Sequence, residues 1–240
     1  GKTYTIFGGD SFQDRGLIPR TLSLIFQEMK TRQNDRTTYK CHISFTEVYK
    51  ESLYDLLDPK KRHVPMELWI PVQIYESENG LMMRNINVFE VNDEEQALNL
   101  FFMGNTNRIT ASTLMNNASS RSHAVFSIII ESETIIDNPL SEVYANTMSS
   151  PSGTNNGQIP TNSVFTIGKL NLVDLAGSER MYKLQNSKNM ISEAKSINLS
   201  LHFLEQVIIT LRDVNNKFVD QINHPSSNKE NAPHIPYRNS

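Results

Sequence analysis

The sequence predicts an α/β domain with a mostly parallel or mixed central sheet, and two observations lead to this prediction. Segments with helical periodicity alternate along the chain with segments rich in β-branched and aromatic residues. The chain has 240 residues, which is enough for one large domain with a sizeable core. In sheets of this class ligands bind at the carboxyl ends of strands, so the polar motifs that follow strands become candidate sites.

The first half of the chain is expected to begin with a helix and continue into strands. Residues 17–32 have apolar side chains at helical spacing and carry Pro19 in a first-turn position, which predicts a helix. Residues 39–49 alternate and are rich in β-branched and aromatic side chains, which predicts a strand. "ESLYDLLDP" is expected to form a short helical or looped segment that ends at Pro59. The mixed stretch from there to residue 80 is expected to hold loops and short edge strands.

The second half continues the alternation. Strands are expected at 81–91, 122–133 and 164–177, and helices at 92–104 and 191–212. Two polar stretches, about 138–162 and 213–233, read as insertions, and the first of them is expected to be disordered.

Composition excludes several classes of protein. The apolar run Ala124–Ile130 is far shorter than a membrane span, and no basic-then-apolar signal segment opens the chain, so no membrane partner is expected. The single cysteine, Cys41, rules out an intrachain disulfide framework and favours a reducing compartment. The lysines are scattered and not interleaved with aromatic residues, so no nucleic-acid partner is expected either.

The net charge of −3 is unevenly distributed. Residues 181–240 hold seven Lys and Arg against five Asp and Glu, whereas the rest of the chain is acidic. This mildly basic quarter could meet an acidic partner surface, or it could be ordinary solvated charge.

Two motifs suggest a nucleotide site. The chain opens with Gly1, Lys2 and Thr3, the last three positions of the P-loop pattern, in which backbone amides and a lysine hold phosphates. Further on, an apolar strand pattern ends at Asp174 and is followed by Gly177 in a D-x-x-G arrangement. Such an aspartate can hold Mg²⁺ through water, and such a glycine can offer its N–H to a γ-phosphate. Either motif alone is common in loops.

A third motif lies at the mouth of the strand predicted at 122–133. The hydroxyls of Ser119 and Ser120 could coordinate Mg²⁺ or bind γ-phosphate oxygens and the attacking water. The planar guanidinium of Arg121 could pair with the carboxylate of Glu179. A hydroxyl-rich turn that caps the strand, with a solvated Arg121, would explain the same residues.

Taken together and in this order, the motifs resemble those of the kinesin motor domain. The opening G-K-T, "NNASSRSHAVFSI" and "LVDLAGSER" are similar to the end of the P-loop, switch I and switch II of that family. The supporting stretches are "GLIPR", "FTEVYKESLYDLLD", "NRITASTLMN", "EAKSINLSL" and "HIPYRNS". The resemblance implies a P-loop NTPase-like fold with a mixed central sheet flanked by helices, and a partial motor domain over residues 1–240. It also implies ATP and Mg²⁺ as cofactors.

The resemblance assigns the roles of individual residues. Gly1, Lys2, Thr3 and Asp174 would bind the nucleotide, with Thr3, Ser120 and, through water, Asp174 holding Mg²⁺. Ser119 and Ser120 would close over the γ-phosphate and Gly177 would sense it. Arg121 and Glu179 would form a salt bridge between the two switches that closes when ATP is bound and positions water for attack.

The resemblance also implies a face that binds microtubules. The candidate residues are Lys183, Lys188, Lys195 and Arg238. Leu199 stands where the family often has lysine, and Asn239 where it usually has aspartate, which puts contacts on this side in doubt. "INLSLHFLEQVI" is closer to the ninth kinesin family, which is linked to cilia and flagella.

Compared with the family pattern, the domain is truncated at both ends. The front of the P-loop and the first strands would lie before Gly1, and the last strand, last helix and neck linker after Ser240. Because a sheet without its P-loop strand exposes an edge, these residues alone are expected to fold poorly and to hydrolyse ATP slowly or not at all.

The leading hypothesis is a microtubule-stimulated ATPase that produces microtubule-based movement in the cytoplasm and cytoskeleton, with a cilium or flagellum as the specific site. A full-length protein of this kind could dimerise through a stalk. One alternative is a microtubule-binding tether without turnover. A second is another P-loop switch protein such as a G protein, against which stand "SSRSH" and the lack of an N-K-x-D guanine signature.

Overall fold

The computed structural model describes residues 1–9, 11–61, 64, 68–77, 80–113, 122–136, 162–177 and 188–223. The helices are α1 (Lys2–Phe7), α2 (Leu17–Arg32), α3 (Glu94–Thr113) and α5 (Lys188–Asn223), with short 3₁₀ segments η1 (Phe12–Asp14) and η2 (Pro59–Lys61). The strands are β1 (Thr37–Tyr49), β2 (Ser52–Asp55), β3 (Gln73–Ser77), β4 (Gly80–Arg84), β5 (Phe89–Val91), β6 (His123–Ile136) and β7 (Asn162–Asp174). None of the helices within these ranges is both long and apolar enough to cross a membrane.

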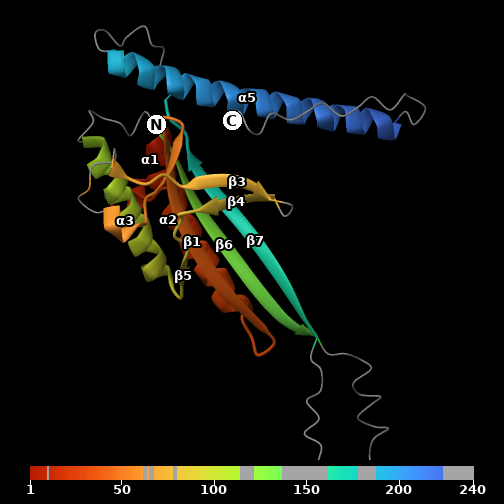
Figure 1. The fold of residues 1–240 in the computed structure, drawn as a ribbon. Coiled ribbons are helices and arrows are strands. Elements are labelled where there is room, and N and C mark those ends of the chain that lie inside the picture. The colour runs from red at the N-terminus through yellow and green to blue at the C-terminus, as the bar shows by residue number, and fades with distance from the viewer. Residues whose placement is uncertain are drawn as a thin grey trace, which may run out of the picture.

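A central sheet organises the described residues (Figure 1), with strand order β2-β1-β6-β7 and with β5 also paired to β1. Each of these pairings is antiparallel. β3 and β4 form a separate two-stranded hairpin. The predicted α/β fold with a sheet and flanking helices is confirmed, although the parallel pairing that was also considered has no counterpart among the described strands.

The strand register brings three positions into one line across the sheet. Glu47 on β1 lies opposite Ala124 on β6, and Ala124 lies opposite Asp174 on β7. Directly opposed residues point to the same face, so the two carboxylates lie on one face, two strand spacings or about 10 Å apart. The small side chain of Ala124 leaves room between them for a third group.

An aromatic cluster fixes the helices to the sheet. Phe7 of α1 and Phe101 of α3 pack on Phe45 of β1 and Phe126 of β6, with ring centroids between 5.3 and 6.3 Å apart. The four rings are at most 7% exposed. Gly104 of α3 lies against this cluster, and a Cβ at that position would be 2.3 Å from Cδ1 of Phe45. The chain therefore needs glycine here for the close approach of α3 to β1.

The segment after β1 differs from the prediction. "ESLYDLLDP" was expected to be helical or looped, but it contains β2, which pairs with residues 46–49 of β1. Lys50 and Glu51 have φ values of 48° and 61°, so they form a two-residue turn that sends the chain back as a hairpin. Residues 81–91 were expected to form one strand, but Asn85, with φ of 63°, separates β4 from β5.

Two helices are longer than expected. α3 continues past residue 104 to Thr113, and α5 runs to Asn223, so that residues 213–223 of the second expected insertion are helical. No glycine or proline interrupts 213–223, and Val214, Phe218 and Ile222 recur at helical spacing. The first expected insertion lies outside the described residues except for Asn162, which begins β7.

Candidate functional site

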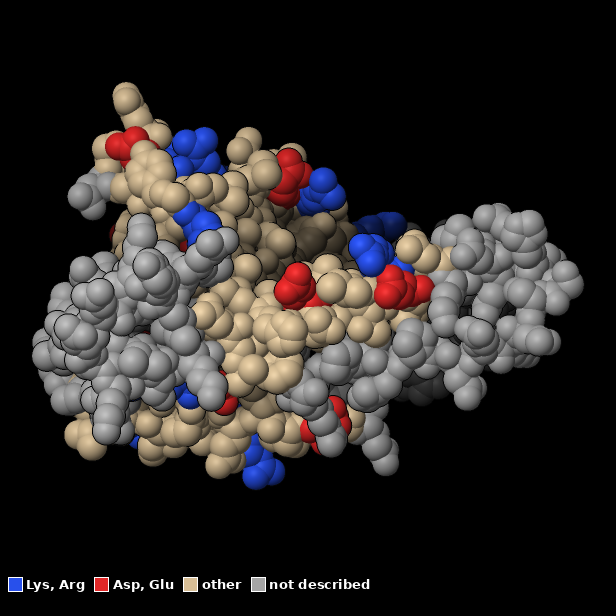
Figure 2. Space-filling model, turned by 90° about the horizontal axis from the view of Figure 1, so that it is seen from above, with Lys and Arg blue, Asp and Glu red and all other residues tan. Residues whose placement is uncertain are grey.

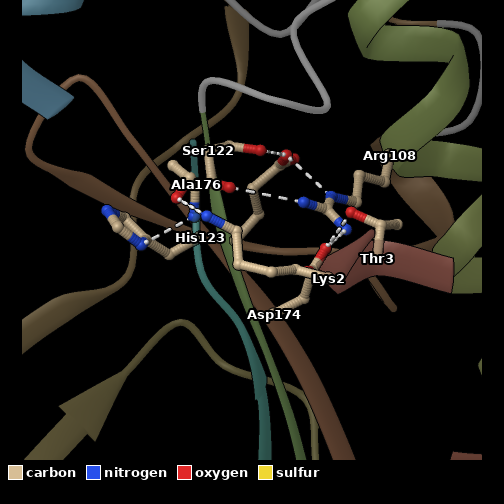
Figure 3. A network of polar contacts seen from close by, with 8 residues as sticks. Lys2, Thr3, Arg108, Ser122, His123, Asp174 and Ala176 are labelled. Atoms are coloured by element: carbon tan, nitrogen blue, oxygen red, sulfur yellow. Dashed lines mark hydrogen bonds and ion pairs between the residues drawn. The ribbon is translucent and has the colours of Figure 1, made fainter. Parts of the chain in front are cut away.

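The first residues of the chain, where the end of a P-loop was expected, meet the end of β7 (Figure 3). Thr3 Oγ1 donates to Asp174 Oδ2 at 2.9 Å, and Lys2 Nζ donates to the carbonyl oxygen of Ala176 at 2.9 Å. Lys2 and Thr3 open α1, whereas Asp174 ends β7 and Ala176 follows it. Residues more than 170 positions apart thus form one polar site, and Gly177 is the next residue of the loop.

Arg108 of α3 stands at the centre of this site, and the sequence reasoning gave it no role. Its side chain is 2% exposed. Its Nη1 donates to Asp174 Oδ2 at 2.8 Å, and its Nη2 donates to the carbonyl oxygen of Ser122 at 3.3 Å. Nε lies 3.5 Å from Glu47 Oε1, and the guanidinium carbon lies 5.2 Å from the centre of the Phe7 ring.

Glu47 is the second buried acid of the site and was likewise missed. It accepts a hydrogen bond from Ser122 Oγ at 2.5 Å. Burial raises the pKa of Glu47, and this effect is opposed by the Ser122 hydrogen bond and the charge of Arg108. Arg108 therefore bridges the two carboxylates that the strand register places on either side of Ala124.

The signal that could have revealed Arg108 and Glu47 was present in the sequence. Both lie inside the stretches "NRITASTLMN" and "FTEVYKESLYDLLD" that supported the family resemblance. Glu47 also stands within a strand pattern rich in apolar residues, where a buried charge requires a partner. The partners of Arg108 are 61 and 66 residues away, so the pattern alone could not identify them.

The residues present fit a nucleotide with a divalent cation. Asp174 Oδ1 is buried and has no hydrogen-bond partner, although Oδ2 of the same carboxylate has two. Thr3 gives its proton to Asp174, which leaves the lone pairs of its hydroxyl oxygen directed elsewhere. Hard oxygen atoms of this kind are the ligands that Mg²⁺ prefers.

His123 lies beside the same loop. Its Nδ1 accepts a hydrogen bond from the backbone N–H of Ala176 at 3.1 Å. Burial, followed by the nearby charges of Lys2 and Arg108, lowers the pKa of His123. The ring is therefore neutral at physiological pH, as an accepting Nδ1 requires.

The structure describes only a few of the remaining predicted site residues. Ser119, Ser120, Arg121, Glu179, Lys183 and Arg238 lie outside the described residues, so the switch salt bridge stays a prediction. Lys188 and Lys195 belong to α5, but their side chains are not described. On the face that Figure 2 shows, the basic and acidic side chains of the described residues are interspersed, without a patch of one sign.

Comparisons with known proteins show which family the chain resembles. The model of the kinesin motor domain matches residues 1–240. The chain is 34% identical to the kinesin-like protein KIF9 of Mus musculus over 241 residues, which cover 100% of this chain and 25% of that protein. It is 37% identical to KIF9 of Homo sapiens (89% of this chain, 24% of that protein) and 36% identical to the kinesin-like protein KLP1 of Chlamydomonas reinhardtii (88% and 24%). The chain thus spans about a quarter of the length of these curated relatives.

Solved structures give the same result. A fast kinesin, described with implications for ATPase mechanism and interactions with microtubules, aligns with a TM-score of 0.68 at 30% identity, over 100% of this chain and 55% of that one. A KIF14 dimer with AMP-PNP in complex with a microtubule aligns with a TM-score of 0.73 at 29% identity, over 100% and 56%. The expected similarity to the ninth kinesin family is in line with the KIF9 relatives.

Proposed function

Because the chain belongs to the kinesin motor domain family, we propose that it hydrolyses ATP and couples hydrolysis to movement on microtubules. The observation that carries this proposal is the meeting of Lys2 and Thr3 with Asp174 and Ala176, since a phosphate site needs these groups in one place. The family supports association with microtubules and the cytoskeleton in general. ATP turnover and movement belong to this proposal.

The nucleotide is held by groups that already face one another. The Lys2 ammonium has three N–H donors, so it can contact β- and γ-phosphate oxygens while one donor remains on Ala176. Gly1 would contribute its backbone to the same cradle. Thr3 and Ser120 and, through water, Asp174 Oδ1 would hold Mg²⁺, which when bound neutralises phosphate charge during transfer.

Arg108 and Glu47 support this arrangement without touching the phosphates. Arg108 binds Asp174 Oδ2, which fixes the carboxylate plane and leaves Oδ1 directed away from the ion pair. Glu47 holds the opposite side of the guanidinium and Ser122. Ser122, which follows Arg121, is thereby linked through Arg108 to Asp174, the acid that would support the metal.

The proposal includes the switch residues that follow from the family pattern. Ser119 and Ser120 close over the γ-phosphate and Gly177 senses it. The Arg121–Glu179 salt bridge positions the attacking water. Lys183, Lys188, Lys195 and Arg238 are proposed to contact the acidic surface of tubulin, and the KIF14 neighbour bound to a microtubule supports a partner of this kind. Placement in a cilium or flagellum and dimerisation through a stalk are part of the same proposal.

The test is phosphate release from ATP by the full-length protein, with and without polymerised tubulin. We expect strong stimulation by microtubules, which Glu179→Ala and Lys2→Ala abolish. Lys60→Ala, at an exposed position outside the site, is the matched control and should turn over like the wild type. Tight microtubule binding by the wild type without turnover would reject the proposal in favour of a tether.

Asp174 gives a more specific test of the metal. Asp174→Asn should raise the Mg²⁺ concentration needed for nucleotide binding, measured with a fluorescent ATP analogue. The amide retains the shape of the side chain but loses the charge that attracts the cation. Equal Mg²⁺ dependence in wild type and variant would remove Asp174 from the metal site.

A further inference from the structure

One stretch of β1 lacks a neighbour on the side away from β6. On that side β5 pairs with residues 41–43 and β2 pairs with residues 46–49. Thr37 exchanges two backbone hydrogen bonds with Asn34 of the preceding turn, at 3.1 and 3.2 Å. Residues 38–40 lie between these pairings. Because β7 lies on the other side of β6, this gap does not border the strand that carries Asp174.

Tyr39 directs its backbone N–H and C=O into this gap. In an antiparallel ladder the backbone groups of successive residues point to alternate sides of the strand. Arg36 faces β6, since its carbonyl oxygen accepts from the N–H of Ile135 at 2.8 Å. Thr37 faces the opposite way, toward Asn34. Tyr39, two residues further on, faces the same way as Thr37, and no other described residue forms a backbone hydrogen bond with it on that side.

The gap borders a cavity of about 730 Å³ between α2, β1 and the turn from β5 to α3. The wall on the α2 side includes Phe26 and Met29, which are half-buried and pack against the core. Methionine is flexible and adapts to side chains of different shape. The cavity thus combines an apolar wall with an unpaired strand edge, which are the two features by which a sheet takes up an extended peptide.

Three acids line the cavity, and each already has a contact within the chain: Glu90, Asp93 and Glu94. Asp93 caps α3, because its Oδ1 accepts from the N–H of Gln96 at 2.8 Å. Glu94 accepts a hydrogen bond from Ser23 Oγ of α2, and Glu90 Oε2 lies 3.8 Å from His42 Nε2. The partial positive charge at the start of α3 further offsets the charges of Asp93 and Glu94.

The two lysines of the cavity have no such contacts. Lys30 on α2 and Lys40 on β1 are exposed, and neither forms a hydrogen bond or an ion pair with another described residue. Lys40 follows Tyr39, so the alternation of a strand places the two side chains on opposite faces. The unpaired charge at the cavity is therefore positive, and a carboxylate is the group that complements it.

We propose that this cavity binds a short extended peptide segment of a partner protein, with an apolar residue that pairs with Tyr39 and an acidic residue beside it. The apolar residue donates its N–H to the Tyr39 carbonyl oxygen and accepts from the Tyr39 N–H. Directly opposed residues point to the same face, so its side chain lies on the face of Tyr39, which α2 covers with Phe26 and Met29. The acidic neighbour lies on the face of Lys40 and meets its ammonium group. The pairings on either side of residues 38–40 limit the contact to about three residues, or about 10 Å of extended chain.

The test uses the blocked tripeptide acetyl-Glu-Leu-Glu-amide and the full-length protein. We expect a Kd on the order of 1 mM in a ligand-observed NMR titration, because so short a peptide makes few contacts. Amide hydrogen exchange then locates the peptide. At ten times its Kd the peptide should slow exchange of the Tyr39 amide about tenfold, since only the free protein exchanges. The amide of Thr38, which faces β6, is the internal control and should not change.

Two matched peptides separate backbone pairing from charge. Methylation of the leucine nitrogen removes the donor to the Tyr39 carbonyl oxygen and should weaken binding about fivefold, the loss expected for one hydrogen bond. Acetyl-Lys-Leu-Lys-amide keeps the backbone and the apolar side chain, but it should bind about tenfold more weakly because attraction to Lys40 becomes repulsion. In the protein, Lys40→Gln should weaken binding of the acidic peptide about threefold. Lys60→Gln, at an exposed lysine outside the cavity, should leave binding unchanged.

The inference is overturned if acetyl-Glu-Leu-Glu-amide does not bind at about 10 mM, or if the methylated or the basic peptide binds equally well. Unchanged binding by Lys40→Gln would also overturn it. Protection of the Tyr39 amide that rises with protein concentration in the absence of peptide would assign the cavity to a second copy of this chain instead. None of these measurements requires nucleotide or microtubules, so a protein that protects Tyr39 but shows no ATP turnover would support this inference and refute the proposed function.

Discussion

Replacement of Arg108 by alanine is the sharpest stability test that the structure offers. The side chain is 2% exposed, and the two acids with which it pairs, Glu47 and Asp174, have side chains 5% and 0% exposed. Arg108→Ala would leave both carboxylates in a buried site without their shared cation. It would also remove the guanidinium from the Phe7 ring.

The expected loss in free energy of unfolding is about 3 kcal/mol. Breaking a buried ion pair by removing one partner costs about 3–5 kcal/mol. The lower end applies here because burial already raises the pKa of Glu47, so this acid can take up a proton once Arg108 is gone. A loss of this size is a large part of the roughly 5–15 kcal/mol by which domains are stable.

The loss in free energy of unfolding is measured by urea unfolding, followed by the fluorescence of Trp69, the single tryptophan of the 240 residues. The control is Arg32→Ala, because Arg32 forms an exposed pair with Glu28 and its removal should cost about 0.5 kcal/mol or less. Adding Glu47→Gln to Arg108→Ala should recover part of the loss, since it removes one of the two uncompensated charges. A loss below about 1 kcal/mol in Arg108→Ala, or no recovery in the double variant, would refute the argument from buried charge.

Three further predictions concern the core and the site. Gly104→Ala should lower the free energy of unfolding in urea by about 1–3 kcal/mol, because the added Cβ would overlap the fully buried ring of Phe45. Alanine has the better helix propensity, so a stabilised variant would contradict this prediction. Cys41 is buried, and burial raises its pKa to about 11, so a maleimide should label this thiol only after unfolding. Rapid labelling of the native protein would show that β1 opens locally. His123 has a lowered pKa, so the unfolded chain binds its proton more readily and this residue should cost stability as the pH falls from about 7.5 to about 5.5. The slope is read as the difference between wild type and His123→Gln, since the raised pKa of Glu47 acts with the opposite sign, and equal slopes would show that His123 is not held neutral by the fold.

The sequence predicted the elements whose signals are local. The helix at residues 17–32 has its expected bounds, because Pro19 and the apolar spacing lie within the helix itself. The meeting of Lys2 and Thr3 with Asp174 was expected from the resemblance of their motifs to a known family. β2 was misread because Leu53, Leu56 and Leu57 also suit a helix, and because the turn at Lys50 and Glu51 contains no glycine or asparagine to mark it.

The site could be predicted only in part for a related reason. A P-loop lysine or a strand-end aspartate is recognised by its neighbours in sequence. Arg108 gains its role from the register that places Glu47 and Asp174 on either side of Ala124, and that register depends on the pairing of three long strands. Spacing along the chain does not encode this geometry, so a buried charge in a helix reads as an ordinary surface residue.

The length of α5 turns a small change at one residue into a large one elsewhere. Its 36 residues span about 54 Å, and the part from Ser200 to Asn223 spans about 35 Å. A rigid helix of this length that tilts by about 10° about Ser200 would move its far end by about 6 Å.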